Sequence, residues 1–287
     1  MSGQVSFLPA RLPFDGHGVL AWLAARAVPG LEQVDASSYR RAIRVDGGPI
    51  VLSLSVADSG VHIAVPGGGD RAGRVPVRGV ADLFDLEADP AVIGHVLGAD
   101  GALAVSVGAN PGLRAPGTVD PAETAIRTVL GQQVSVSAAR KLNERLVAAY
   151  GDRISAPVGA VTHAFPTMET LAESDLAAVG MPGARRATVR ALATAIARGT
   201  LRLEPVDDPA TTFRRLIAIR GVGEWTAAYI ALRALGHKDA FPAADAGIRR
   251  GARSLGLDVE AGALISRAES WRPWRAYAAH HLWSAVG

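Results

Sequence analysis

The sequence contains no cysteine among its 287 residues. Disulfide bonds, thiolate nucleophiles and cysteine-ligated zinc or iron–sulfur sites are therefore excluded. It also contains no apolar run of about 18 residues, the length at which a membrane-spanning helix becomes a candidate. The first residues lack the apolar core behind a basic end that marks a secretory signal peptide. We therefore expect a cytoplasmic protein that does not enter a membrane.

Lysine is scarce as well, because only Lys141 and Lys238 are lysines among 30 basic residues. Residues 1–120 contain 9 basic and 12 acidic residues, whereas residues 121–287 contain 21 basic and 15 acidic residues. The positive charge thus gathers in the second part, where a polyanion is expected to bind. Hydrophobic residues make up 49% of the chain, which is enough for packed cores and argues against a disordered chain.

Apolar residues alternate with period two in the first third of the chain, at residues 43–45, 52–56 and 61–65, with glycine-containing turns between them. This pattern predicts antiparallel strands with one buried face. Residues 20–28 are rich in helix formers. Residues 1–96 are therefore predicted to form a small α+β domain.

The strand signal fades after this region. Asp120 is followed by Pro121 and, three residues after the aspartate, by Glu123, which is typical of a capped helix start. From there to the end, segments rich in Ala, Leu and Arg alternate with short Gly or Pro breaks. The second part is therefore predicted to be all-helical.

The most informative segment runs from Leu216 to Arg233 and reads LIAIRGVGEWTAAYIALR, a helix, a Gly-x-Gly turn and a second helix. Glycine permits positive φ angles and the close approach of a partner. The free amides at the start of the second helix favour an anion such as a phosphate. The pattern is short, and a plain helical hairpin whose glycines serve only the turn fits it equally well.

Several segments together extend this motif into a family resemblance. The chain resembles the DNA-3-methyladenine glycosylase II family of the helix–hairpin–helix DNA glycosylase superfamily, in the order LAARAV (23–28), LFDL (83–86), PGLRAPG (111–117), VLGQQVSV (129–136), GVGEWTAAYIALR (221–233) and RPWRAYAAHHLW (272–283). The resemblance implies a two-lobed helical body behind the α+β domain, with the DNA cleft between the lobes. One lobe would comprise residues 121–237, ending in the hairpin at 216–233, and the other residues 97–120 together with 238–287.

The activity that this resemblance implies is the excision of alkylated bases, such as 3-methyladenine and 7-methylguanine, from duplex DNA, the first step of base excision repair. The damaged nucleotide would be flipped out of the helix, and the N-glycosidic bond would be hydrolysed. We expect a monomer whose partner is duplex DNA and which requires no cofactor.

Asp245 stands among apolar residues, 22 positions after Gly223. An aspartate in such a place most often caps a helix. The resemblance instead implies a catalytic role, and the two roles are compatible. Breaking the glycosidic bond builds positive charge on the sugar, which a desolvated carboxylate stabilises while it orients or deprotonates the attacking water.

Aromatic residues are the candidates for the base pocket. Trp225 and Tyr229 are four residues apart and share one helix face, which also fits ordinary core packing. The resemblance assigns the pocket to Trp22, Trp225, Tyr229 and Trp283, whose electron-rich faces attract a cationic alkylated base. It leaves Trp271 and Trp274 to core packing.

Trp225 also bears on the reaction type. In superfamily members that cut the DNA strand, a lysine at this position forms a Schiff base with the sugar. Neither lysine of this chain matches that position, so the resemblance implies a hydrolase without lyase activity.

The resemblance also implies a set of DNA contacts. Gln133 would fill the gap left by the flipped base, although a surface glutamine fits the sequence too, and better-known relatives carry a bulky apolar residue there. Ala246 and Gly247 replace larger residues of some relatives, which predicts a roomier pocket. Of the adjacent His280 and His281, we expect one to face inward and one outward. The implied DNA-binding residues are Gln133, Gly221, Gly223, Thr226, Arg249 and Arg250.

No side-chain spacing indicates a zinc site. The resemblance implies that backbone carbonyls of Ile217, Ile219 and Val222 hold a monovalent cation, Na⁺ or K⁺, that bridges to a DNA phosphate. Two other functions stay open. A non-catalytic protein that senses alkylated DNA would share the hairpin without needing Asp245, and a bifunctional glycosylase–lyase conflicts with Trp225.

Overall fold

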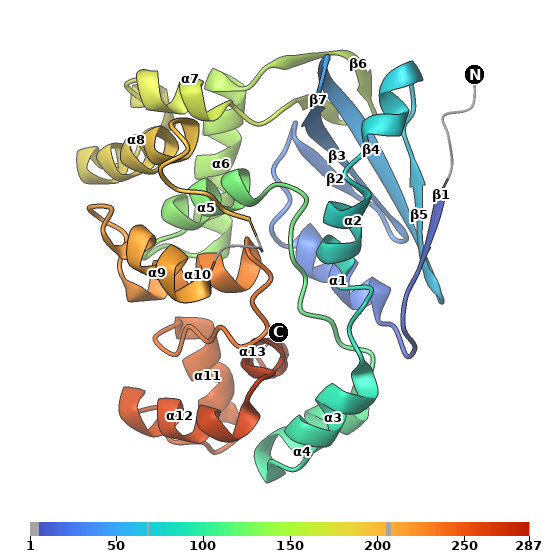
Figure 1. Cartoon of the computed structure of the whole chain (residues 1–287), viewed down its shortest axis with the longest axis vertical. Helices are drawn as coiled ribbons and strands as arrows, with labels where there is room; N and C mark the ends of the chain where they lie inside the picture. The colour runs from blue at the N-terminus through green and yellow to red at the C-terminus, as the bar shows by residue number, and fades with distance from the viewer. Residues whose placement is uncertain (1–5, 68, 205–207, 287) are drawn as a thin grey trace.

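The computed structural model describes residues 6–67, 69–204 and 208–286. The N-terminal domain is built on an antiparallel five-stranded sheet with the strand order β1-β5-β4-β3-β2 (Figure 1). The three strands predicted from alternation are β3, β4 and β5, and they are joined by the two predicted glycine turns. The bounds are β1 (Ser6–Pro9), β2 (Glu32–Val34), β3 (Ser38–Val45), β4 (Gly48–Ala57) and β5 (Gly60–Ala64).

One face of this sheet packs against two helices, α1 (Gly16–Ala24) and α2 (Val77–Phe84). The 3₁₀ turn η1 (Gly69–Arg74) comes shortly before α2. Leu20, Leu54 and Phe84 are fully buried in this core. On the opposite face, Ala42 and Val51 belong to the core of the first helical lobe. The sheet is thus covered on both faces where it meets the helices.

The first helical lobe comprises six helices around one core that contains Ile126, Leu146 and Leu192. The predicted cap at its start is confirmed, because the Asp120 side chain accepts a hydrogen bond from the Glu123 amide at 2.9 Å. Its helices are α5 (Pro121–Leu130), α6 (Val136–Tyr150), α7 (Met168–Glu173), α8 (Gly183–Ala197), α9 (Pro209–Ile217) and α10 (Glu224–Arg233), with the 3₁₀ turn η2 (Ala177–Val179).

The prediction that this part is entirely helical was wrong in one place. Two short strands, β6 (Arg153–Val158) and β7 (Val161–His163), form a hairpin between α6 and α7. Their pairing is irregular, and bonds from the N-terminal domain support it: the carbonyl of Gly30 accepts from the amides of Thr162 and His163 at 2.7 and 2.9 Å. The strand conformation therefore depends on a distant segment rather than on local pattern.

The second lobe packs around a separate core that contains Leu103, Trp271 and Leu282. Ile93 and Leu97 lie in this core, so residues 90–96, which were predicted to belong to the first domain, belong to this lobe instead. Figure 1 shows α3 and α4 beside the helices of the C-terminal end. The elements are α3 (Pro90–Gly98), α4 (Gly101–Ala109), α11 (Ala246–Ser254), α12 (Ala261–Ala268), η3 (Glu269–Trp271) and α13 (Arg275–Ser284).

Aspartate side chains begin many of these helices. The carboxylate of each N-cap accepts at least one hydrogen bond from a backbone amide of the first turn. The capping residues of α1, α3, α4, α5, α9 and α11 are, in that order, Asp15, Asp89, Asp100, Asp120, Asp208 and Asp245. Such caps satisfy amides that the first turn leaves free. Within the described residues, no helix is long and apolar enough to span a membrane.

Candidate active site and DNA interface

Asp245 is both a helix cap and the centre of the candidate site. Its Oδ1 accepts from the amides of Gly247 and Ile248 at 2.9 and 3.0 Å, so it caps α11. The indole nitrogens of two pocket residues also donate to it, Trp283 to Oδ1 at 2.8 Å and Trp225 to Oδ2 at 3.1 Å. Oδ1 therefore has three donors and Oδ2 one. A carboxylate oxygen accepts two or more hydrogen bonds, so Oδ2 has capacity left for a substrate.

Three predicted aromatic residues meet beside this carboxylate. The ring centroids of Trp225 and Tyr229 are 5.4 Å apart, and those of Tyr229 and Trp283 are 6.0 Å apart. Together with Asp245 they line a pocket of about 390 Å³. A pocket of this size, with aromatic walls and one convergent carboxylate, is typical of a small-molecule site, and a single flipped base is of that class.

The roomier pocket predicted from Gly247 is not present at that position. A Cβ atom on Gly247 would lie 2.8 Å from Cδ1 and 2.9 Å from Nε1 of Trp283. The indole ring therefore occupies the space that a larger residue would fill. Glycine is required here so that Trp283 can reach the Asp245 carboxylate.

Trp22 was predicted to line the pocket, and its position differs. Its ring stacks against Trp283 at 5.1 Å and against His280 at 4.8 Å. The guanidinium carbon of Arg26 lies 3.3 Å from its ring centroid and covers it. Arg26 is a lining residue and Trp22 is not. Trp22 therefore supports the wall from behind, because an arginine one helical turn later takes its place at the surface of the pocket.

The two adjacent histidines are both buried, contrary to the expectation that one faces outward. His281 lies within hydrogen-bond distance of the Ser106 hydroxyl, 2.9 Å from Nδ1 to Oγ. Burial lowers the pKa of His281 to about 4 and that of His280 well below its ordinary value. Both are therefore neutral at pH 7.

Among the described residues no cluster of three metal-ligating side chains occurs.

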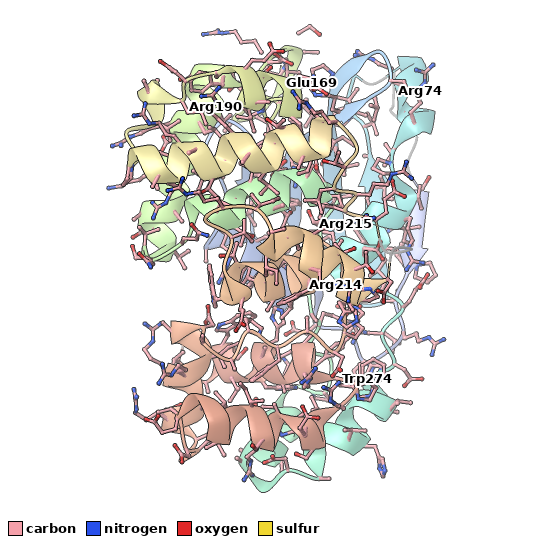
Figure 2. The ribbon with its side chains drawn as sticks, turned by 60° about the vertical axis from the view of Figure 1, so that its left-hand side comes forward. Arg74, Glu169, Arg190, Arg214, Arg215 and Trp274 are labelled. Atoms are coloured by element: carbon pink, nitrogen blue, oxygen red, sulfur yellow. The ribbon has the colours of Figure 1, made fainter. Side chains whose placement is uncertain are left out.

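The assignment of two further tryptophans to packing is confirmed. Trp271 is fully buried, and its indole nitrogen donates to Asp100 at 2.7 Å. Trp274 stacks edge-on against Tyr277 at 5.7 Å, on the second lobe (Figure 2). Neither residue lines the pocket.

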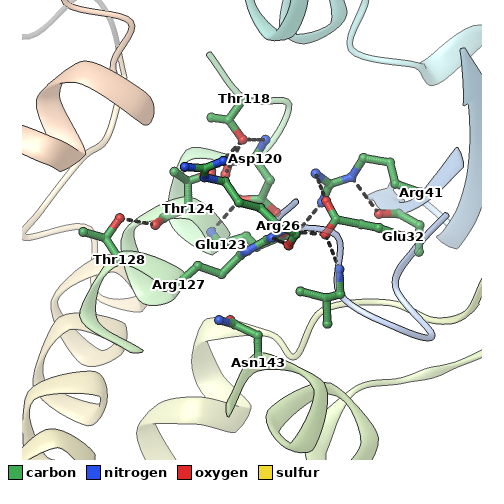
Figure 3. A network of polar contacts seen from close by, with 12 residues as sticks. Arg26, Glu32, Arg41, Thr118, Asp120, Glu123, Thr124, Arg127, Thr128 and Asn143 are labelled. Carbon is green, nitrogen blue, oxygen red and sulfur yellow. Dashed lines mark hydrogen bonds and ion pairs between the residues drawn. The ribbon is translucent and has the colours of Figure 1, made fainter. Parts of the chain in front are cut away.

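Behind the aromatic wall lies a buried ionic network that sequence reasoning missed. Arg127 pairs with Glu32 at 3.0 Å and with Glu123 at 2.8 Å, and Arg41 pairs with the same two carboxylates (Figure 3). Burial raises the pKa of Glu123, whereas the arginines overcome the effect of burial on Glu32 and lower its pKa. The four charges balance. The network joins the N-terminal sheet to α5 and gives the pocket a rigid floor.

The two glycines of the hairpin have different structural roles. Gly221 has φ of +91°, and a Cβ atom there would lie 2.0 Å from the Thr188 hydroxyl. Gly223 has φ of −93°, so the predicted positive φ is wrong for it. Nothing lies within 4 Å of its missing Cβ, and no side chain caps α10. The amides of the first turn of α10 therefore remain open to an anion.

Thr226 was predicted to contact DNA, but its side chain is 2% exposed. Its hydroxyl accepts from Gln132 Nε2 at 2.8 Å, and the same amide group donates to the Gly221 carbonyl at 2.9 Å. Gln132 thus fastens the α5–α6 loop to the hairpin. The Thr226 side chain is therefore committed to the protein interior and is not available to DNA.

Gln133 is exposed at the tip of this loop and has φ of +55°. The left-handed region is uncommon for a residue with a side chain, and such strain concentrates at functional sites. The preceding residue, Gln132, is held through its backbone as well as its side chain, because Arg185 donates to the Gln132 carbonyl at 2.6 Å. A held loop with a projecting side chain fits the predicted gap-filling role.

The two predicted arginines of α11 differ in availability. Arg250 is exposed and lines the mouth of the pocket. Arg249 is half-buried, and its Nε donates to the Val259 carbonyl at 3.1 Å. Further exposed arginines lie on the first helical lobe, including Arg190 and Arg214, which Figure 2 labels.

The cation site predicted at the hairpin rests on backbone carbonyls. The Ile219 carbonyl already accepts from the Val222 amide at 2.9 Å, which leaves one lone pair for a cation. Ile217 is the exposed last residue of α9. The cation site stays a prediction.

Comparisons with known proteins agree with this arrangement. Residues 6–120 match the AlkA N-terminal domain family, and residues 126–276 match the family described as HhH-GPD superfamily base excision DNA repair protein. The chain has a TM-score of 0.83 against a 3-methyladenine DNA-glycosylase from Archaeoglobus fulgidus, with 20% identity and 97% of each chain covered. This structural likeness concerns the fold.

Two curated proteins give closer sequence matches. A Mycobacterium tuberculosis protein named as a probable bifunctional transcriptional activator/DNA repair enzyme AlkA is 44% identical over 99% of this chain, which spans 58% of the length of that relative. DNA-3-methyladenine glycosylase 2 of Escherichia coli is 37% identical over 96% of this chain and 95% of its own length. The chain therefore belongs to the HhH-GPD superfamily of base excision DNA repair proteins and, within it, to the family of DNA-3-methyladenine glycosylase 2.

Proposed function

We propose that this protein is a monofunctional DNA glycosylase that hydrolyses the N-glycosidic bond of alkylated bases in duplex DNA. One observation carries the proposal: the Asp245 carboxylate is held by four donors at the edge of an aromatic pocket, and Oδ2, which accepts from only one of them, keeps acceptor capacity for a substrate. The name of the Escherichia coli relative, DNA-3-methyladenine glycosylase 2, supports the choice of alkylated bases.

The catalytic step follows from this geometry. The flipped base lies among Trp225, Tyr229 and Trp283, and the sugar lies next to Asp245. As the C1′–N bond breaks, positive charge develops on the sugar and Oδ2 stabilises it. Water then attacks C1′, and the same carboxylate orients it and accepts its proton. The four donors hold the carboxylate in place before the charge forms, so little reorganisation is needed.

We further propose that the enzyme lacks lyase activity. Trp225 donates its indole N–H to Asp245 at the place where the resemblance puts the lysine of strand-cutting relatives. Lys238 pairs with Asp85 and lies over the ring of Tyr277, so it is committed elsewhere. Lys141 is exposed on α6 and is not a lining residue.

Duplex DNA is the proposed partner of a monomeric protein. The open amides of α10 bind a backbone phosphate, with Na⁺ or K⁺ at the hairpin carbonyls bridging to it. Gln133 fills the gap left by the flipped base and Arg250 contacts a phosphate at the mouth of the pocket. No cofactor takes part in the reaction.

The decisive test is Asp245→Asn with measurement of base release from methylated duplex DNA. The amide oxygen can keep the α11 cap, but its NH₂ group faces the indole N–H of Trp225, and the negative charge is lost. We expect base release to fall by roughly two orders of magnitude or more, with DNA affinity retained. Wild-type release by this variant would favour the non-catalytic sensor. Covalent trapping of the wild-type protein on DNA by borohydride would contradict the absence of lyase activity.

A further inference from the structure

Two arginines of the pocket lack a carboxylate partner. Both Arg26 and Arg233 line the pocket, and neither has a carboxylate within ion-pair distance among the residues that the structure describes. The nearby buried carboxylates Glu32 and Glu123 are already balanced by Arg41 and Arg127 (Figure 3). The inner pocket therefore carries an excess of positive charge.

The positions of both guanidinium groups are set by Trp22. Arg26 lies 3.3 Å from its ring centroid and donates to its carbonyl at 3.2 Å, whereas Arg233 lies 5.4 Å from the ring. Nη1 of Arg233 is buried without a hydrogen-bond partner. Burial lowers the pKa of both groups, that of Arg233 to about 10, so both remain protonated at neutral pH.

Cations removed from water without a carboxylate partner are costly, and they also repel a cationic base. A cationic substrate such as 7-methylguanine therefore gains nothing from them. Burial lowers the pKa of Arg26, and the nearby Tyr229 and Asp245 only partly offset that effect. The two arginines can instead stabilise a group that gains negative charge only during the reaction.

We propose that Arg26 and Arg233 stabilise the negative charge on the departing base when the excised base is neutral. The inference rests on the proposed glycosylase function. For a neutral base, the C1′–N9 electron pair leaves with the base, which becomes an anion while the sugar becomes an oxocarbenium ion. Water adds to C1′ and loses a proton, and the base anion gains a proton, so the products are the abasic sugar and the neutral free base.

A cationic base leaves as a neutral molecule, so this stabilisation does not apply to it. Asp245 and the two arginines thus act on opposite sides of the same breaking bond, one on the sugar and the others on the base. The arginines are specificity-determining residues that extend excision from cationic to neutral bases.

The test is single-turnover excision with saturating enzyme from duplexes that contain 7-methylguanine, hypoxanthine or unsubstituted purine. The variants are Arg26→Gln, Arg26→Lys and, as a matched control at the mouth of the pocket, Arg250→Gln. For Arg26→Gln we expect the rate enhancements for both neutral bases to fall on the order of 100-fold relative to that for 7-methylguanine. Arg26→Lys should restore part of the loss because it keeps the charge. Arg250→Gln should weaken binding to all three duplexes alike.

Three results would overturn the inference. Equal losses for all three bases would place Arg26 on a phosphate or in the structural support of the pocket, and no loss at all would mean that Arg26 takes no part in excision. A loss for hypoxanthine alone would mean that Arg26 reads a carbonyl oxygen, which unsubstituted purine lacks. Arg233→Gln provides a second variant if Arg26→Gln melts at a lower temperature than the wild type. A wild-type protein that releases no 7-methylguanine would instead refute the proposed function.

Discussion

Gly247→Ala tests whether Trp283 positions the catalytic carboxylate. The added Cβ would lie 2.8 Å from Cδ1 of the indole, closer than a Cβ atom approaches a neighbour in real structures. The ring must therefore move, and the 2.8 Å hydrogen bond from its Nε1 to Asp245 must lengthen or break. A hydrogen bond to a charged group contributes about 1.5–3 kcal/mol. Alanine recovers about 0.5–1 kcal/mol over glycine inside a helix.

The net expectation is a loss of roughly 1–2 kcal/mol in the free energy of unfolding. Activity should fall further than stability, because a carboxylate displaced by about 1 Å loses on the order of 100-fold in rate. The measurements are the thermal melting temperature and the single-turnover release of 7-methylguanine. DNA affinity should stay near that of the wild type, since Gly247 lies in the pocket rather than at the hairpin.

Two other glycines provide the controls. Gly262 lies in α12 with nothing within 4 Å of its missing Cβ, so Gly262→Ala should stabilise the lobe slightly and leave activity intact. A Cβ on Gly251 would lie 1.8 Å from the Leu282 carbonyl, so Gly251→Ala should separate α11 from α13 and abolish folding of the lobe. If Gly247→Ala behaves like Gly262→Ala in both melting and base release, the positioning role of Trp283 is refuted.

Four further outcomes are expected. Gly223→Asp places a charge beside the open amides and should weaken binding to lesion and undamaged duplexes alike; a loss confined to lesion DNA would assign the hairpin to base recognition. Glu123→Gln leaves buried arginine charge uncompensated and should cost about 3–5 kcal/mol in chemical denaturation. Because burial lowers the pKa of His281 to about 4 and also lowers that of His280, both stay neutral in the folded state while the unfolded chain protonates. Stability should therefore fall as the pH drops from about 6.5 towards 4, and flat denaturation midpoints over that range would contradict this. Trp283→Leu should reduce 7-methylguanine release more than hypoxanthine release, by about 1 kcal/mol, unless the pocket acts by shape alone.

The sequence predicts those elements whose conformation is determined by neighbouring residues, and it misses those that depend on contacts with distant segments. Apolar residues alternate in the sequence of strands β3 to β5, and the turns between them contain glycine, so their prediction was confirmed. The β6–β7 hairpin was missed because the carbonyl of Gly30, in another domain, holds it. The boundary at residue 96 was displaced for a similar reason. Ile93 and Leu97 are apolar in either domain, and only the packed structure shows which core they enter.

The residues of the candidate site could likewise be predicted in part from the sequence, whereas their arrangement depends on contacts that only the structure shows. Asp245 could be found only through the family resemblance, because the residues around it favour a helix cap, and the structure confirms that it does cap a helix. Trp22 could be found as an aromatic residue, but not as a support behind the wall, because that depends on Arg26 covering its ring. The vacant space expected beside Gly247 was misjudged, since the residue that fills it, Trp283, is 36 positions away in the sequence.

The charge of the pocket could not be predicted by counting charged residues along the sequence. Arg26 belongs to the part of the chain with an acidic excess, and Arg233 belongs to the part with a basic excess. Both lie beside the same indole ring, whereas the carboxylates around them are paired with other arginines. The electron-rich rings favour a cationic base, and the two arginines oppose it. These two effects offset each other, so the pocket binds cationic and neutral bases with similar affinity. The pocket then discriminates between the two classes by the charge that the base carries as it leaves, and not by its charge when bound. A pocket of this kind accepts lesions of both classes and depends on Asp245 for each of them.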